Sequence, residues 1–86
     1  MKLQWTSRAI EDLEKLSHNV SDRITGKMDW FSSQEDPLSF SKRLVGNFIA
    51  YRFRLGDYRI ICTLDKGVFN VLSVLSVKHH KDVYRS

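Results

Sequence analysis

The sequence predicts one α+β domain over residues 1–86, with a short N-terminal strand and an antiparallel two-helix hairpin ahead of a three-stranded antiparallel sheet. Three observations predict this class. Residues 2–6 alternate in character, and residues 9–31 carry two helical stripes. Residues 48–64 alternate with a period of two around Gly56-Asp57, and a second glycine-containing turn precedes the apolar run 68–77. Both helices have one apolar side, so we expect them on one face of the sheet.

Composition limits the partners more than it limits the chemistry. The chain has 14 Lys plus Arg and 10 Asp plus Glu, a formal charge of +4 and a pI near 9.5. This charge favours polyanionic partners, of which nucleic acids and acidic proteins both qualify. Cys62 is the single cysteine, so it cannot form an internal disulfide, and it is expected in the core. No apolar run is long enough for a signal peptide or a membrane span, which favours a cytoplasmic location.

The first half of the chain is expected to supply one strand and two helices. The strand covers residues 2–6, and Thr6 or Ser7 caps the first helix. The apolar face of this helix consists of Ala9, Ile10, Leu13 and Leu16, and Glu11, Asp12 and Glu14 are expected outside it. After a break near residues 17–19, the second helix carries the stripe Val20, Ile24, Met28 and Phe31.

Residues 32–41 form the longest polar stretch and are expected to be a surface connection. Lys42 and Arg43 follow this stretch and add to the basic surface. Residues 44–47 then lead into a strand over residues 48–55.

A hairpin centred on Gly56-Asp57 is the clearest local prediction. If these two residues form the turn, Arg54 faces Arg59, and the residues on the two strands divide between two faces of the sheet. One face carries Arg52, Arg54 and Arg59. The core face carries Tyr51, Phe53, Leu55, Tyr58, Ile60 and Cys62.

The last strand is expected over residues 68–77, after a turn at residues 65–67, and two registers are possible. A two-residue loop places Phe69, Val71 and Leu75 on the core face. A three-residue loop places Val68, Leu72 and Val74 there. The pattern is apolar on both faces and favours neither register.

The three arginines suggest a site for an anion. Like charges directly opposite one another destabilise a sheet, so a bound anionic group would offset the cost of Arg54 facing Arg59. Guanidinium groups make planar, two-pronged contacts with phosphate and stay charged. The alternative is a solvated outer face whose arginines keep the protein soluble.

Two motifs make the chain resemble the RelE/ParE superfamily of bacterial toxins, and its RelE branch more closely. They are Gly-Asp-Tyr-Arg-Ile-Ile at 56–61 and the ending His-His-Lys-Asp-Val-Tyr-Arg at 79–85. The resemblance spans nearly the whole chain. It implies a ribosome-dependent endoribonuclease that cuts messenger RNA in the decoding site and is held inactive by a cognate antitoxin.

The resemblance also assigns site residues. The family's basic residues before the turn, commonly lysines, fall on Arg52 and Arg54, and the arginine after the turn falls on Arg59. The late basic residue falls within His79–Lys81, and the C-terminal tyrosine falls on Tyr84. The wider RNA-binding set expected from charge and position comprises Arg52, Arg54, Lys42, Arg43, Lys78 and His79.

The chemistry of these residue types suggests a different role in RNA cleavage for each. A ribose 2′-hydroxyl can attack the adjacent phosphate, and the arginines suit the charge of the transition state but cannot move protons. Tyr84 is the candidate base, because nearby cations favour its phenolate. His80 or Lys81 is the candidate acid, with His79 next. On a strand, His79 and His80 point to opposite faces, so they cannot both act in one site. No Asp, Cys or third His stands at a useful spacing from the two histidines, so we expect no metal, and no cofactor is expected either.

The sequence also fits three other interpretations. Tyr84 could pack its ring on the sheet without a chemical role. The protein could inhibit DNA gyrase, as the ParE branch does, with no chemistry of its own. It could also be an inactive homologue that acts in a repressor complex with its antitoxin.

Overall fold

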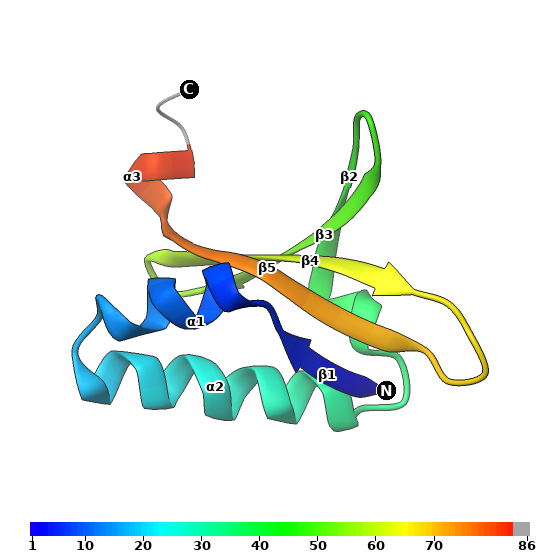
Figure 1. The fold of residues 1–86 in the computed structure, drawn as a ribbon, viewed down its shortest axis with the longest axis horizontal. Helices are drawn as coiled ribbons and strands as arrows, with labels where there is room; N and C mark the ends of the chain where they lie inside the picture. The colour runs from blue at the N-terminus through cyan, green and yellow to red at the C-terminus, as the bar shows by residue number, and fades with distance from the viewer. Residues whose placement is uncertain (84–86) are drawn as a thin grey trace.

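Two helices cover one face of a five-stranded sheet in the computed structural model, which describes the backbone of residues 1–83 and the side chains of residues 1–81 (Figure 1). In chain order the elements are β1 (Lys2–Trp5), α1 (Ser7–Glu14), α2 (His18–Ser33), the 3-10 turn η1 (Pro37–Phe40), β2 (Ser41–Val45), β3 (Ile49–Leu55), β4 (Tyr58–Asp65), β5 (Val71–His79) and α3 (His80–Val83). The predicted α+β class, with both helices on one face, is confirmed. No helix in residues 1–83 is long and apolar enough to cross a membrane.

The sheet has the order β1-β5-β4-β3-β2 and differs from the prediction in its number of strands. β1 runs parallel to β5, and the other neighbours are antiparallel. The prediction missed β2, because Ser41–Val45 is a short edge strand with polar side chains and gives no apolar alternation. Ser41, the last residue of the expected surface connection, therefore belongs to a strand that continues to Val45 and pairs with β3.

The first helix, α1, begins after the predicted cap Thr6, but it is rotated relative to the prediction. Thr6 accepts a hydrogen bond from the Ala9 amide at 3.2 Å, and the α2 stripe of Ile24, Met28 and Phe31 is buried as expected. In α1, however, Asp12 is only 9% exposed whereas Ile10 is 46% exposed. The predicted placement of these two residues was wrong, because Asp12 bonds to the backbone of β5.

The core lies between the helices and the sheet. Its buried members are Ala9, Ile24, Met28, Phe31, Phe53, Ile60, Cys62, Leu72, Val74 and Val77. Tyr51, Leu55 and Tyr58 pack against this core, so the predicted core face of the central hairpin is confirmed. Burial raises the pKa of the Cys62 thiol to about 12, which keeps it protonated and unreactive.

β5 follows neither of the two predicted registers completely. A five-residue connection, 66–70, joins β4 to β5 and leaves Val68 and Phe69 highly exposed. Leu72 and Val74 face the core, as the three-residue alternative required. Cys62 then pairs with Val74 but Ile61 pairs with Ser76, so Leu75 is an extra residue, a β-bulge. The bulge reverses the alternation of side chains between the two faces of the sheet, so the Val77 side chain faces the core.

Candidate functional site

The predicted pairing of the central hairpin is confirmed residue by residue. Arg54 lies opposite Arg59, and Arg52 lies opposite Ile61. Gly56 has a φ of 60° in the turn, a conformation that glycine adopts without strain. The turn sequence therefore fixes which side chains share the open face of the sheet, the face that α1 and α2 do not cover.

Strand register extends the basic surface beyond the three arginines. Lys42 of β2 lies directly opposite Arg52, and Lys78 of β5 lies directly opposite Arg59. Directly opposed residues project from the same face of a sheet. The open face therefore carries a group that we call the cationic ladder, which consists of Lys42, Arg52, Arg54, Arg59 and Lys78.

Little negative charge offsets the ladder. Among the side chains that the structure describes, no Asp or Glu oxygen lies within 4.0 Å of a ladder nitrogen, and the one Arg or Lys ion pair joins Arg8 to Asp12. Asp65, on the same face, instead accepts a hydrogen bond from the Ser73 hydroxyl at 2.8 Å. The like charges of the ladder therefore oppose one another across adjacent strands, which is unfavourable in the isolated protein.

Arg59 is the most constrained member of the ladder. Its residue is only 7% exposed, and its Nη1 donates to the carbonyl oxygens of Gly56 at 2.9 Å and Tyr58 at 3.1 Å. These bonds hold the guanidinium against the β3–β4 turn. Arg59 is thus a fixed positive charge rather than a freely solvated side chain, whereas Arg54 is exposed.

The two histidines lie near the same turn but in different surroundings. His80 begins α3, where its amide donates to the Asp57 carbonyl oxygen at 2.7 Å and its Nδ1 lies 3.3 Å from the same oxygen. His79 lies opposite Tyr58 on the helix side, and its ring meets the Tyr58 ring edge-on with centroids 5.4 Å apart. The rings of His79 and His80 are 4.5 Å apart, so the expectation of opposite faces was wrong. The strand ends between them, and the rule for strands does not apply.

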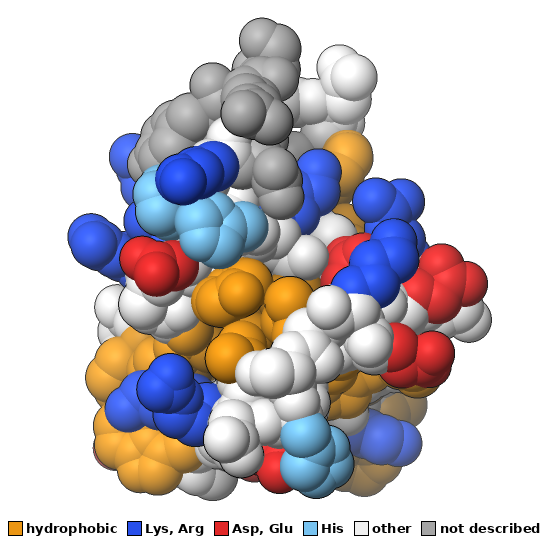
Figure 2. Space-filling model, turned by 90° about the vertical axis from the view of Figure 1, so that its left-hand side faces the viewer, with side chains coloured by type: hydrophobic (Ala, Val, Ile, Leu, Met, Phe, Trp, Pro, Cys, Tyr) orange, Lys and Arg blue, Asp and Glu red, His pale blue; other side chains and the backbone are white. Residues whose placement is uncertain are grey.

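The remaining predicted residues divide between the ladder and other surfaces. Arg43 lies opposite Tyr51 and so shares the helix side of β2, away from Lys42. Lys81 is exposed in α3. Tyr84 lies outside the described residues. Figure 2 views the end of the molecule where the β3–β4 turn and α3 lie, and shows most of its Lys and Arg side chains in the upper half, around histidine side chains.

A groove on the helix side provides a second type of surface. It has a volume of about 940 Å³ and lies between α2 and the β3–β4 turn. Val20, Ile24, Leu55 and Tyr58 give it an apolar lining. Within the described residues, no cluster of three or more His, Cys, Asp or Glu side chains could hold a metal ion.

Solved toxin–antitoxin complexes contain chains of this fold. One is the RelBE2 complex of Mycobacterium tuberculosis, with a TM-score of 0.74, 23% identity, and coverage of 91% of this chain and 95% of that one. A second is the archaeal RelE–RelB complex of Pyrococcus horikoshii OT3, with a TM-score of 0.70, 25% identity, and coverage of 99% and 97%. A third is the RelB–RelE complex of Methanococcus jannaschii, with a TM-score of 0.66, 20% identity, and coverage of 94% of each chain.

The sequence match is to a toxin family of the same superfamily. Residues 3–84 match the family described as the ParE toxin of the type II toxin-antitoxin system parDE. The chain therefore belongs to the ParE toxin family, within the RelE/ParE superfamily, and is a toxin of a type II toxin-antitoxin system. The predicted superfamily is confirmed. No curated protein sequence matches the chain.

Proposed function

We propose that this toxin is a metal-independent endoribonuclease that cleaves messenger RNA on the ribosome and so inhibits translation. The observation that carries the proposal is the cationic ladder, five basic residues in register on the one sheet face that the helices leave open. A phosphate backbone supplies the closely spaced negative charges that such a surface needs.

The proposed reaction uses the substrate's own nucleophile. The ribose 2′ oxygen attacks the adjacent phosphorus, and the bond from phosphorus to the 5′ oxygen breaks. The 2′ proton passes to a base, and the 5′ oxygen receives a proton from an acid. The products are a 2′,3′-cyclic phosphate and a 5′-hydroxyl end. DNA lacks the nucleophile and should not be cut.

The arginines stabilise the negative charge that develops on the phosphate. Arg59 suits this role best, because its hydrogen bonds to Gly56 and Tyr58 hold the guanidinium in place before substrate arrives. Arg52 and Arg54 act beside it, and Lys42 and Lys78 extend the contact along the RNA backbone. Guanidinium groups stay protonated at neutral pH and serve poorly as acid or base, so proton transfer falls to other residues.

His80 is the preferred acid, with Lys81 as the alternative. The backbone and ring of His80 contact Asp57, in the same turn that holds the Arg59 guanidinium through Gly56. A carbonyl oxygen only accepts, so the contact with Nδ1 assigns a proton to that nitrogen and leaves Nε2 for proton transfer. Tyr84 is the proposed base. His79 and Arg43 lie on the helix side and are not assigned a role in the reaction.

A cognate antitoxin is the second proposed partner. The solved relatives are toxin–antitoxin complexes, and this chain offers two surfaces that suit one amphipathic, acidic segment. Its acidic side chains would pair with the cationic ladder, and its apolar side would fit the groove beside α2. Binding of this kind would block RNA from the ladder.

Gyrase inhibition is the second candidate function, and the family match favours it, because that family is named for ParE. Two assays with one preparation separate the candidates. Purified protein is added to a translating extract, where transcripts are checked for cleavage, and to DNA gyrase, where supercoiling is measured. The proposal expects cleavage without loss of supercoiling, and expects Arg59→Ala and Tyr84→Phe each to abolish cleavage.

The opposite pattern would replace the proposal. Intact transcripts together with lost supercoiling, from protein shown to be folded, would establish the gyrase inhibitor. Intact transcripts with normal supercoiling, and no toxicity when the protein is expressed without its antitoxin, would indicate an inactive homologue.

A further inference from the structure

The bulge in β5 decides which residues of the C-terminal segment join the cationic ladder. With Leu75 as the extra residue, Lys78 lies opposite Arg59 and Val77 enters the core. Without the bulge, the alternation after Leu75 would reverse, so Ser76 and Lys78 would face the core and Val77 would face outward. The placement of Lys78 on the ladder therefore depends on the bulge.

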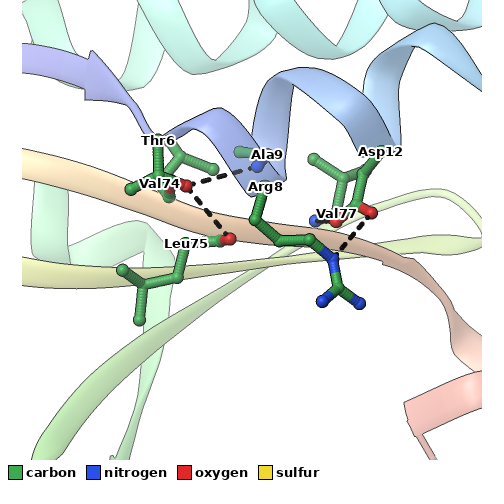
Figure 3. Close-up of polar contacts among 7 residues, drawn as sticks. All are labelled: Thr6, Arg8, Ala9, Asp12, Val74, Leu75 and Val77. Atoms are coloured by element: carbon green, nitrogen blue, oxygen red, sulfur yellow. Dashed lines mark hydrogen bonds and ion pairs between the residues drawn. The ribbon is translucent and has the colours of Figure 1, made fainter.

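A bulge leaves backbone polar groups outside the regular hydrogen bonds between strands. Here Thr6, the N-cap of α1, and Asp12 within α1 bind them (Figure 3). The Thr6 hydroxyl lies 2.8 Å from the Val74 carbonyl oxygen and 3.2 Å from that of Leu75. Consecutive carbonyls of a regular strand point to opposite edges, so two such contacts to one hydroxyl reflect the bulge. The Thr6 amide also donates to Val74, at 3.1 Å.

Asp12 completes this arrangement from the other end of α1. Its Oδ2 accepts a buried hydrogen bond from the Val77 amide at 2.9 Å, and its Oδ1 accepts from Arg8 Nε at 3.2 Å. β1 ends opposite Val74, so past this point α1 replaces it along the edge of β5. In the register without a bulge, the Val77 amide would point toward β4 and away from Asp12. The Asp12 bond is therefore specific for the bulged register.

We infer that Thr6 and Asp12, which we call the bulge clamp, are positioning residues that hold Lys78 and the start of α3 beside Arg59. The clamp touches no ladder side chain and acts through the backbone of β5. Its relevance to RNA rests on the proposed function, but its effect on strand register does not.

Asp12→Ala tests the clamp, because it leaves the Val77 amide without an acceptor. Residue-resolved amide hydrogen exchange should show loss of protection at Val77 by about tenfold or more. Asp12→Asn keeps a side-chain oxygen acceptor and should retain most of the protection. Glu11→Ala removes a carboxylate from an exposed position of the same helix and should leave exchange unchanged. Unchanged protection of Val77 in folded Asp12→Ala would overturn the inference.

A second readout follows the position of Lys78. Binding to a 2′-O-methyl RNA oligonucleotide, which lacks the nucleophile, is measured over a range of salt concentrations. Loss of one phosphate contact lowers the slope of log affinity against log salt by about 0.7 for a single strand. Asp12→Ala should lower the slope as much as Lys78→Ala does. General destabilisation without displacement of Lys78 would leave the slope of the folded protein unchanged and contradict the inference.

Deletion of Leu75 provides a matched background in which Lys78 no longer needs the bulge to reach its position. In that chain, regular strand pairing from Val74 onward brings Lys78 opposite Arg59 without a bulge. Asp12→Ala should therefore no longer change the salt slope. Should Asp12→Ala fail to fold in the full chain, this background decides the question. An equal effect of Asp12→Ala with and without Leu75 would assign Asp12 to general packing. If the wild type binds no free oligonucleotide, the cationic ladder does not hold RNA without the ribosome, whereas amide exchange still tests the clamp.

Discussion

Replacement of Arg54 by Gln should make the protein more stable and less able to bind RNA. Arg54 is exposed, lies directly opposite Arg59, and has no carboxylate partner among the described side chains. Cross-strand pairs change stability by roughly 0.2–1 kcal/mol, and like charges act in the unfavourable direction. For a domain of this size the gain corresponds to a rise in melting temperature of about 1–8 °C.

Thermal unfolding followed by circular dichroism measures this effect at low salt and at high salt. The difference between Arg54→Gln and the wild type should shrink in about 1 M salt, where the Debye length is only about 3 Å. Arg43→Gln is the matched control, because it makes the same change in net charge on the helix side of β2. The reasoning is refuted if Arg54→Gln is less stable at low salt, or if Arg43→Gln stabilises the protein as much.

Three further predictions concern the core and the β4–β5 connection. Phe53→Ala empties a fully buried position beside Phe31 and should remove about 3–5 kcal/mol in urea unfolding; a loss below about 1 kcal/mol would contradict the packing. Because burial raises the pKa of Cys62 from 9.0 to about 12, the unfolded chain binds fewer protons than the folded one above pH 9. The free energy of unfolding should therefore fall with pH there, by at most about 1.4 kcal/mol per unit, and Cys62→Ala should lack this slope. Phe69→Ser, at a residue that is 79% exposed, should change stability by less than about 0.5 kcal/mol, and a larger loss would indicate packing in the β4–β5 connection.

The sequence was most informative where structure depends on near neighbours. The Gly56-Asp57 turn sets the pairing of Arg54 with Arg59 through a few residues on either side, and a helical stripe is a local pattern. Asp12 was misplaced because its partner, the Val77 amide, is 65 residues away in the chain. The pattern of apolar and polar residues along a helix does not show that a buried carboxylate is needed to bind a distant backbone amide.

Lys42 and Lys78 were expected to bind RNA, but their places opposite Arg52 and Arg59 were not predicted, for two different reasons. Lys42 was counted as basic surface, but its place opposite Arg52 depends on β2, an edge strand without apolar alternation. Lys78 depends on the bulge, for which the sequence does hold a signal. Leu72 and Val74 are spaced by two, whereas Val77 comes three residues later, and a break of this kind within an apolar strand indicates an inserted residue.

Mapping the chemistry of cut ends in a translating extract tests the central claim most directly. The wild type should generate transcripts with new 5′-hydroxyl ends. Arg52→Gln should strongly reduce the number of these ends, whereas Arg43→Gln should leave it nearly unchanged, because Arg52 lies on the cationic ladder and Arg43 does not. New ends that carry 5′-phosphate, or equal losses from Arg52→Gln and Arg43→Gln, would contradict the account.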